Sequence, residues 1–155
     1  MRLIPRFKHL LRPDYYLGKR TTKRTNRVVQ AGPFQGMRYI GRAFGSVYFP
    51  KLLGIYEREI YPYIDRVIPE GHDLLVDIGV AEGYFAVGLA LKQPAPVVGF
   101  ESDAEAARAA RDLALLNGVS ERVHLKGLCT PAILQATLEP AARPFLMCDV
   151  DGYET

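Results

Sequence analysis

The stretch that most constrains the fold of this chain is residues 74–91, LLVDIGVAEGYFAVGLAL. Its first five residues are typical of a buried strand, and from Phe85 onward apolar residues recur at the spacing of a helix. Between the two lies a turn that contains Gly79 and Gly83. Glycine lets the backbone come close to a ligand, and the start of a helix offers free N–H groups and a partial positive charge. The stretch therefore predicts a strand, a turn and a helix that together hold an anionic group of a ligand.

The residues of this turn narrow the kind of ligand. A dinucleotide-binding turn has the pattern G-x-G-x-x-G, whereas from Gly79 onward this sequence has Ala81 and Tyr84 at the second and third glycine positions. Glu82 would repel a pyrophosphate but would pair with a cationic amine. S-adenosylmethionine (SAM) has a carboxylate, an ammonium, a sulfonium and no phosphate, and Asp77 is placed to meet its ammonium. The turn thus favours SAM and disfavours an NAD-dependent oxidoreductase.

A second apolar run, residues 96–100, is followed by Glu101, 18 residues after Gly83. An α/β nucleotide site places at this point an acid that accepts hydrogen bonds from both ribose hydroxyls. SAM contains that ribose. Taken alone, the glycines fit an ordinary turn and Glu101 fits a solvated strand end, but their order along the chain favours a cofactor site.

The sequence resembles the class I SAM-dependent methyltransferases, and most closely their FkbM-like branch. The resemblance is carried by four pieces in order: the lead-in GPFQGMRY (32–39) with PKLLGIYERE (50–59), the glycine motif VDIGVAEGYFAVG (76–88), GFES (99–102) and CDVDGYE (148–154). It implies a Rossmann-like domain, SAM as cofactor, and adenine contacts from residues 127–130. It also implies that Tyr56 and Glu57 lie near the cofactor. One departure is Asp151, where the branch more often has Glu, which keeps the charge but shortens the reach.

Two sets of candidate site residues follow. Those expected to bind the cofactor are Asp77, Gly79, Ala81, Glu82, Gly83, Tyr84, Glu101, Ser102, Leu128 and Cys129. Those expected to be catalytic are Asp149 and Asp151, at the carboxyl end of the fourth apolar strand, where ligands bind in open α/β sheets. Acids this close raise one another's pKa, which suits a general base. Two or three carboxylates would also suit Mg²⁺ or Ca²⁺, although we assign no metal site. The alternative without a function is a solvent-exposed acidic turn.

The charge distribution divides the chain. Residues 1–43 hold 11 basic side chains and one acidic side chain, whereas the remaining residues hold 9 basic and 16 acidic ones, which together give the net charge of +3. We predict a basic, flexible arm (1–27), a hairpin and helical cap (28–70) and a SAM-binding domain (71–155). Two cysteines with no disulfide or metal spacing indicate a reducing, cytoplasmic setting, and Cys148 is expected in the core.

Four strands separated by helices predict an α/β fold with a parallel sheet of order 3-2-1-4, joined by right-handed crossovers. Nothing in the sequence covers the open edge of the fourth strand, and an exposed edge is a template for aggregation. We therefore expect either a partner chain on this edge or a chain truncated at its C-terminus, and we favour truncation.

The predicted function is that of a SAM-dependent methyltransferase, or its cofactor-binding half, acting on an oxygen or nitrogen of a small-molecule or sugar acceptor. The alternative is a non-catalytic binding module whose basic arm docks nucleic acid or an anionic membrane surface.

Overall fold

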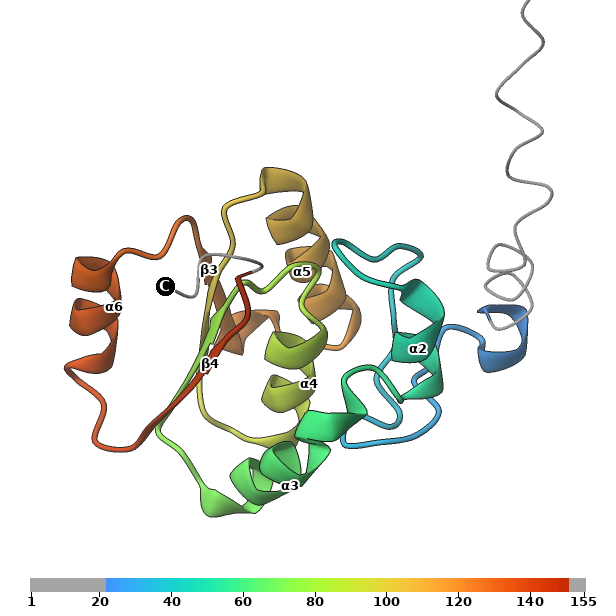
Figure 1. Cartoon of the computed structure of the whole chain (residues 1–155), viewed down its shortest axis with the longest axis horizontal. Coiled ribbons are helices and arrows are strands. Elements are labelled where there is room, and N and C mark those ends of the chain that lie inside the picture. Colours follow the sequence, from blue (N-terminus) through green and yellow to red (C-terminus); the bar gives the residue numbers. More distant parts are fainter. Residues whose placement is uncertain (1–21, 151–155) are drawn as a thin grey trace, which may run out of the picture.

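A computed structural model describes residues 22–150, and its centre is a four-stranded parallel sheet of order β3-β2-β1-β4 (Figure 1). The predicted α/β fold class and strand order are confirmed. The strands are β1 (Leu74–Ile78), β2 (Val97–Phe100), β3 (Val123–Lys126) and β4 (Pro144–Cys148). Because β1 pairs with both β2 and β4, it lies inside the sheet, and all five of its residues are buried.

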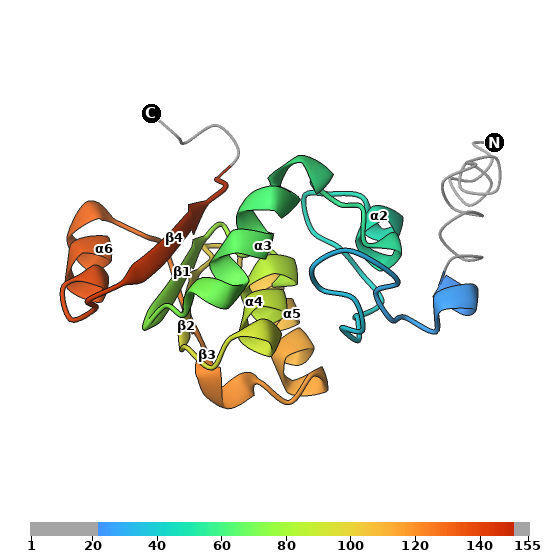
Figure 2. The same cartoon turned by 90° about the horizontal axis from the view of Figure 1, so that it is seen from below.

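Helices precede β1 and then alternate with the strands, as the predicted pattern requires. They are α2 (Tyr48–Leu53), α3 (Tyr61–Glu70), α4 (Tyr84–Lys92), α5 (Ala104–Leu116) and α6 (Pro131–Leu138), with single 3₁₀ turns at Arg58–Ile60 and Ser120–Arg122. Figure 2 shows α6 on one side of the sheet and α3, α4 and α5 on the other. No helix among residues 22–150 combines the length and apolar character needed to cross a bilayer.

The two faces of β1 build two apolar cores. Leu75 points to the face covered by α4 and belongs to the larger core. Leu74, Val76 and Ile78 point to the other face, where Leu134 and other side chains of α6 pack against them. This alternation follows from the period of two in a strand, and burial on both faces explains why every residue of β1 except Asp77 is apolar.

The residues before α3 are part of the larger core. Val28 and Arg38 form an isolated antiparallel bridge, where the sequence predicted a hairpin. Phe34 is 1% exposed, and its ring lies edge-on to Tyr84, with 5.4 Å between the ring centroids. The cap is therefore packed directly against α4. Most of the predicted basic arm, residues 1–21, lies outside the described part of the chain.

The edge strand β4 corrects one expectation. Cys148 is exposed, although the apolar run around it predicted a core position, and Leu146 on the same face is 44% exposed. The reason is that α6 packs over β1 and β2 instead of over β4. An apolar pattern predicts that a strand is present, but it does not predict which helices or strands cover its faces.

Gly88 in α4 tests how closely the cap packs. A Cβ at this position would lie 2.5 Å from a ring carbon of the buried Phe34. We expect Gly88→Ala to lower the free energy of unfolding by about 1–3 kcal/mol, because overpacking outweighs the roughly 1 kcal/mol by which alanine favours a helix. The matched control is Gly127→Ala, whose Cβ would meet no atom within 4 Å. Urea denaturation of both variants checks the prediction, and equal midpoints would contradict it.

Candidate functional site

A cleft of about 1220 Å³ lies where β1, β2 and β4 reach their carboxyl ends, and it collects most of the predicted site residues. Those that line it are Asp77, Gly79, Ala81, Tyr84, Glu101, Ser102, Leu128, Cys129 and Asp149. Glu82 and Gly83 are not part of its lining, and Asp151 lies outside the described residues. Acids from three strand ends and the glycine turn thus meet at one place, as expected for the crevice of an open α/β sheet.

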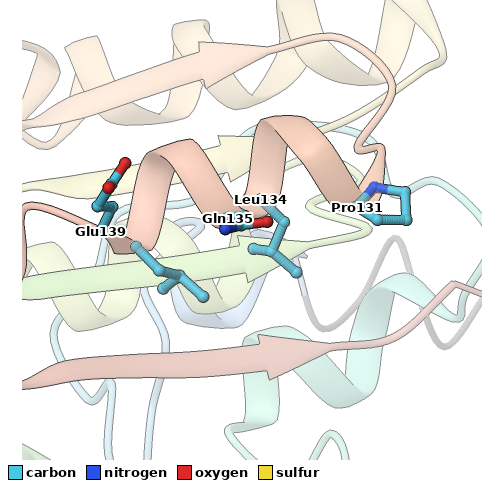
Figure 3. Close-up of a pocket in the computed structure, with 5 residues that line it drawn as sticks. Pro131, Leu134, Gln135 and Glu139 are labelled. Atoms are coloured by element: carbon cyan, nitrogen blue, oxygen red, sulfur yellow. The ribbon is translucent and has the colours of Figure 1, made fainter.

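A second hollow runs along α6 and does not have the chemistry of a site. It measures about 560 Å³ and is lined by Pro131, Leu134, Gln135 and Leu138 of α6 and by Glu139, the residue that caps this helix (Figure 3). Glu139 is the sole ionisable side chain in its lining. We therefore take the cleft at the strand ends as the candidate site.

Gly79 allows β4 to reach this cleft. It has a φ of +86°, and a Cβ at this position would lie 1.7 Å from the carbonyl oxygen of Asp149. The backbone N–H of Asp149 donates to the carbonyl of Ile78 at 2.8 Å. Because the two strands meet this closely, Asp149 stands beside the end of β1.

Glu101 ties the glycine turn to the end of β2. Its Oε2 accepts a hydrogen bond of 2.8 Å from the backbone N–H of Ala81, and its Oε1 accepts one of 2.7 Å from that of Asp103. Ala81 has a φ of +49°, which is uncommon for a residue with a Cβ. Each carboxylate oxygen keeps a second acceptor site, so Glu101 remains able to accept hydrogen bonds from ligand hydroxyls.

Asp77 is a buried acid on the wall of the cleft. It is 4% exposed, and burial raises its pKa to about 7. The backbone N–H of Ala86, in the first turn of α4, opposes this rise, and the nearby Asp149 and Glu101 add to it. Among residues 22–150 no lysine or arginine forms an ion pair with it. A cationic ligand group in the cleft would supply the missing partner and would favour the charged carboxylate.

Glu82 does not have the place that the sequence predicted. It is 0% exposed and its carboxylate faces the cap instead of the cleft. It accepts hydrogen bonds from the hydroxyl of Tyr39 at 2.5 Å and the N–H of Phe44 at 2.9 Å, and it forms an ion pair with Lys51. A buried carboxylate must be hydrogen-bonded and paired, and these three partners meet that need. The expectation that Glu82 contacts the ligand is therefore corrected: it holds the cap to the glycine turn.

The other turn residue, Gly83, is also displaced from the cleft. It is the N-cap of α4, and a Cβ there would lie 3.1 Å from the Cβ of Ala110 in α5. Its place in the glycine motif thus reflects the packing of α4 against α5.

The cap adds residues to the cleft. Tyr56 and Glu57 line it, in agreement with what the resemblance implies, and so do Phe44, Ser46 and Lys51, which the sequence analysis missed. A signal for Lys51 was present: a single lysine inside the run YFPKLL is typical of a buried, paired cation. Among the described residues no group of three or more His, Cys, Asp or Glu side chains is arranged to hold a metal ion.

Comparison with known proteins bears on this architecture. A hypothetical protein from Thermus thermophilus superposes with a TM-score of 0.51 at 14% identity, over 81% of this chain and 71% of that one. The chain has a Rossmann-like fold. No family model and no curated protein match the sequence.

Two methyltransferase structures are also similar to this chain. One is a proposed O-methyltransferase from Klebsiella pneumoniae (TM-score 0.47, 18% identity, 94% of this chain covered). The other is an O-methyltransferase from Bacillus cereus in complex with S-adenosylhomocysteine (SAH) (TM-score 0.44, 18% identity, 93% of this chain covered). The chain spans 57% and 59% of the lengths of these two proteins.

Proposed function

We propose that the cleft binds SAM and that the chain is a SAM-dependent methyltransferase or the cofactor-binding part of one. The observation that carries this proposal is the placement of two acids around one glycine turn. Asp77 lies in β1 and is buried with no ion-pair partner among residues 22–150, and Glu101 follows the neighbouring β2 and accepts the hydrogen bond of the Ala81 N–H at 2.8 Å. A ligand with an ammonium at one end and a ribose in its middle fits both acids.

Each part of the cleft then has a role. Asp77 binds the ammonium, Glu101 accepts from the ribose hydroxyls, and the backbone around Ala81 follows the methionine chain. Leu128, which is 70% exposed, gives an apolar surface for adenine, beside Ser102 and Cys129. Tyr84 packs behind the glycine turn, where its ring lies edge-on to Tyr56.

Catalysis in this cleft is chiefly a matter of alignment. When bound, SAM supplies an electrophilic methyl group on its sulfonium. The protein has to hold an acceptor oxygen or nitrogen in line with that methyl group and exclude water. Asp149, which lines the cleft at the end of β4, is placed to orient the acceptor or to take its proton. Asp151, two residues later, is proposed for the same task.

Other expectations remain predictions at this point. They are membership of the FkbM-like branch, a sugar or other small-molecule acceptor, a partner chain on the β4 edge, and a cytoplasmic location. Contact of the basic arm with nucleic acid or an anionic membrane surface is likewise a prediction.

Calorimetric titration of the full chain with SAH tests the proposal. We expect saturable binding that Glu101→Gln weakens roughly 10- to 100-fold, because a hydrogen bond to a charged group is worth about 1.5–3 kcal/mol. The matched control is Glu105→Gln, an exposed change on α5 outside the cleft, which should leave the affinity unchanged. A folded chain that does not bind SAH would refute the proposal and favour a binding module.

A further inference from the structure

The cleft has a single basic side chain in its lining within residues 22–150, and that side chain is Lys51. The other charged residues that line it are acids: Glu57, Asp77, Glu101, Asp103 and Asp149. An anionic ligand group would be repelled along most of this wall and attracted at Lys51. The distribution of charge therefore favours binding of a ligand carboxylate at Lys51.

Lys51 is held rigidly in this position. It lies in the short helix α2, where the neighbouring Leu52 is 0% exposed and its carbonyl accepts a hydrogen bond of 2.9 Å from the N–H of Gln30. The Lys51 ammonium forms an ion pair with Glu82 of the glycine turn and lies 4.4 Å from the centroid of the Tyr56 ring. The ion pair with Glu82 places the charge beside the turn that follows β1.

The ammonium has capacity for a further partner. It carries three N–H donors, and in the described part of the chain its one recorded hydrogen bond goes to Oε1 of Glu82. Lys51 is 2% exposed, so little water is available to solvate the remaining donors. A second carboxylate in the cleft would satisfy them.

We propose that Lys51 binds the carboxylate of the ligand's amino-acid end, while Asp77 binds its ammonium. This inference rests on the proposed function and names a binding residue that the sequence motifs do not include. An α-amino acid carries both charges on one carbon. A buried base and a buried acid on either side of one glycine turn are complementary to that group.

The test compares SAH with its decarboxylated analogue, S-adenosyl-3-thiopropylamine, by calorimetric titration of the full chain. The two ligands share the ammonium, ribose and adenine and differ in the carboxylate alone. We expect the unmodified chain to bind SAH roughly 10- to 100-fold more tightly than the analogue. In the double variant Lys51→Met/Glu82→Gln, which removes both buried charges together, SAH should weaken to the affinity of the analogue, while the analogue's own affinity changes less than about twofold.

The outcomes separate this inference from the proposed function. If the unmodified chain binds both ligands equally, or if the double variant weakens both to the same extent, Lys51 has a structural role only and the inference is wrong. If the folded, unmodified chain binds neither ligand, the proposed function itself fails, and the inference fails with it. Should the double variant not fold, as judged by circular dichroism, Lys51→Gln replaces it, since glutamine still donates to Glu82. A preference for SAH that survives Lys51→Gln unchanged would overturn the inference.

Discussion

Replacing Asp77 by asparagine is expected to stabilise the ligand-free chain at pH 8 and to remove most of its affinity for SAH. Burial raises the pKa of Asp77 to about 7, so at pH 8 the folded chain has to keep a charged carboxylate that is 4% exposed and has no ion-pair partner in the described part of the chain. Asparagine has the same shape without the charge. Holding the carboxylate charged with a pKa near 7 costs up to about 4 kcal/mol at pH 8, and the variant avoids this cost.

The stability of the unmodified chain should depend on pH through Asp77. Between about pH 4 and pH 7 the folded chain holds a proton on Asp77 that the unfolded chain has lost, because the pKa is raised on folding. The contribution of this group to stability is therefore fully present below pH 4 and is lost as the pH rises through 7. The difference between the variant and the unmodified chain should grow over the same interval and become constant above it.

The affinity for SAH should rise with pH, whereas the contribution of Asp77 to stability falls. A ligand ammonium pairs with the charged form of Asp77, so the affinity of the unmodified chain for SAH should rise with pH up to about 7 and then level off. In Asp77→Asn this rise disappears, and at pH 8 the affinity falls roughly 10- to 100-fold. Urea denaturation and calorimetry at pH 5, 6, 7 and 8 measure both effects. Asp65→Asn, an exposed change on α3, is the control. A variant that binds SAH as tightly as the unmodified chain would contradict the role of Asp77.

The sequence was sufficient to predict those parts of the fold that depend on the local pattern of apolar residues and glycines. The expected strand at residues 74–78 coincides with β1, because a strand buried on both faces is mostly apolar, here with Asp77 as the exception, and has a recognisable end at the glycine turn. Strand order followed from the handedness of the crossovers, which does not depend on side chains. Asp77 and Glu101 meet in one cleft because the carboxyl ends of parallel strands lie at the same edge of the sheet.

The sequence was insufficient where a side chain finds its partners far along the chain. A glutamate inside a glycine turn suggests an exposed group that faces a ligand. In the fold its carboxylate is fully buried, because Tyr39, Phe44 and Lys51, from 31 to 43 residues upstream, converge on it. No local periodicity encodes such a contact. Its trace in the sequence is a lysine in an apolar run, which predicts a buried partner without identifying it.

Glu82→Ala should have the largest effect on stability of the changes considered, with an expected loss of about 3–5 kcal/mol in the free energy of unfolding. The change leaves the Lys51 ammonium at 2% exposure without the ion pair that it forms among residues 22–150, and it deprives the Tyr39 hydroxyl and the Phe44 N–H of their acceptor. Glu82→Gln is the matched comparison. It keeps an acceptor for Tyr39 and Phe44, so it should cost less.

A double-mutant cycle separates the ion pair from the packing around it. Lys51→Met removes the charge that Glu82→Ala leaves unpaired, so the two changes together should cost less than the sum of the single changes, by about 0.5–3 kcal/mol. Urea denaturation of the four chains at pH 7 measures this coupling. Additive losses, or a loss below about 1 kcal/mol for Glu82→Ala, would show that the buried pair does not anchor the cap. A large coupling would mean that the pair of Lys51 and Glu82 fixes the cap to the glycine turn, and with it the cap residues that line the cleft.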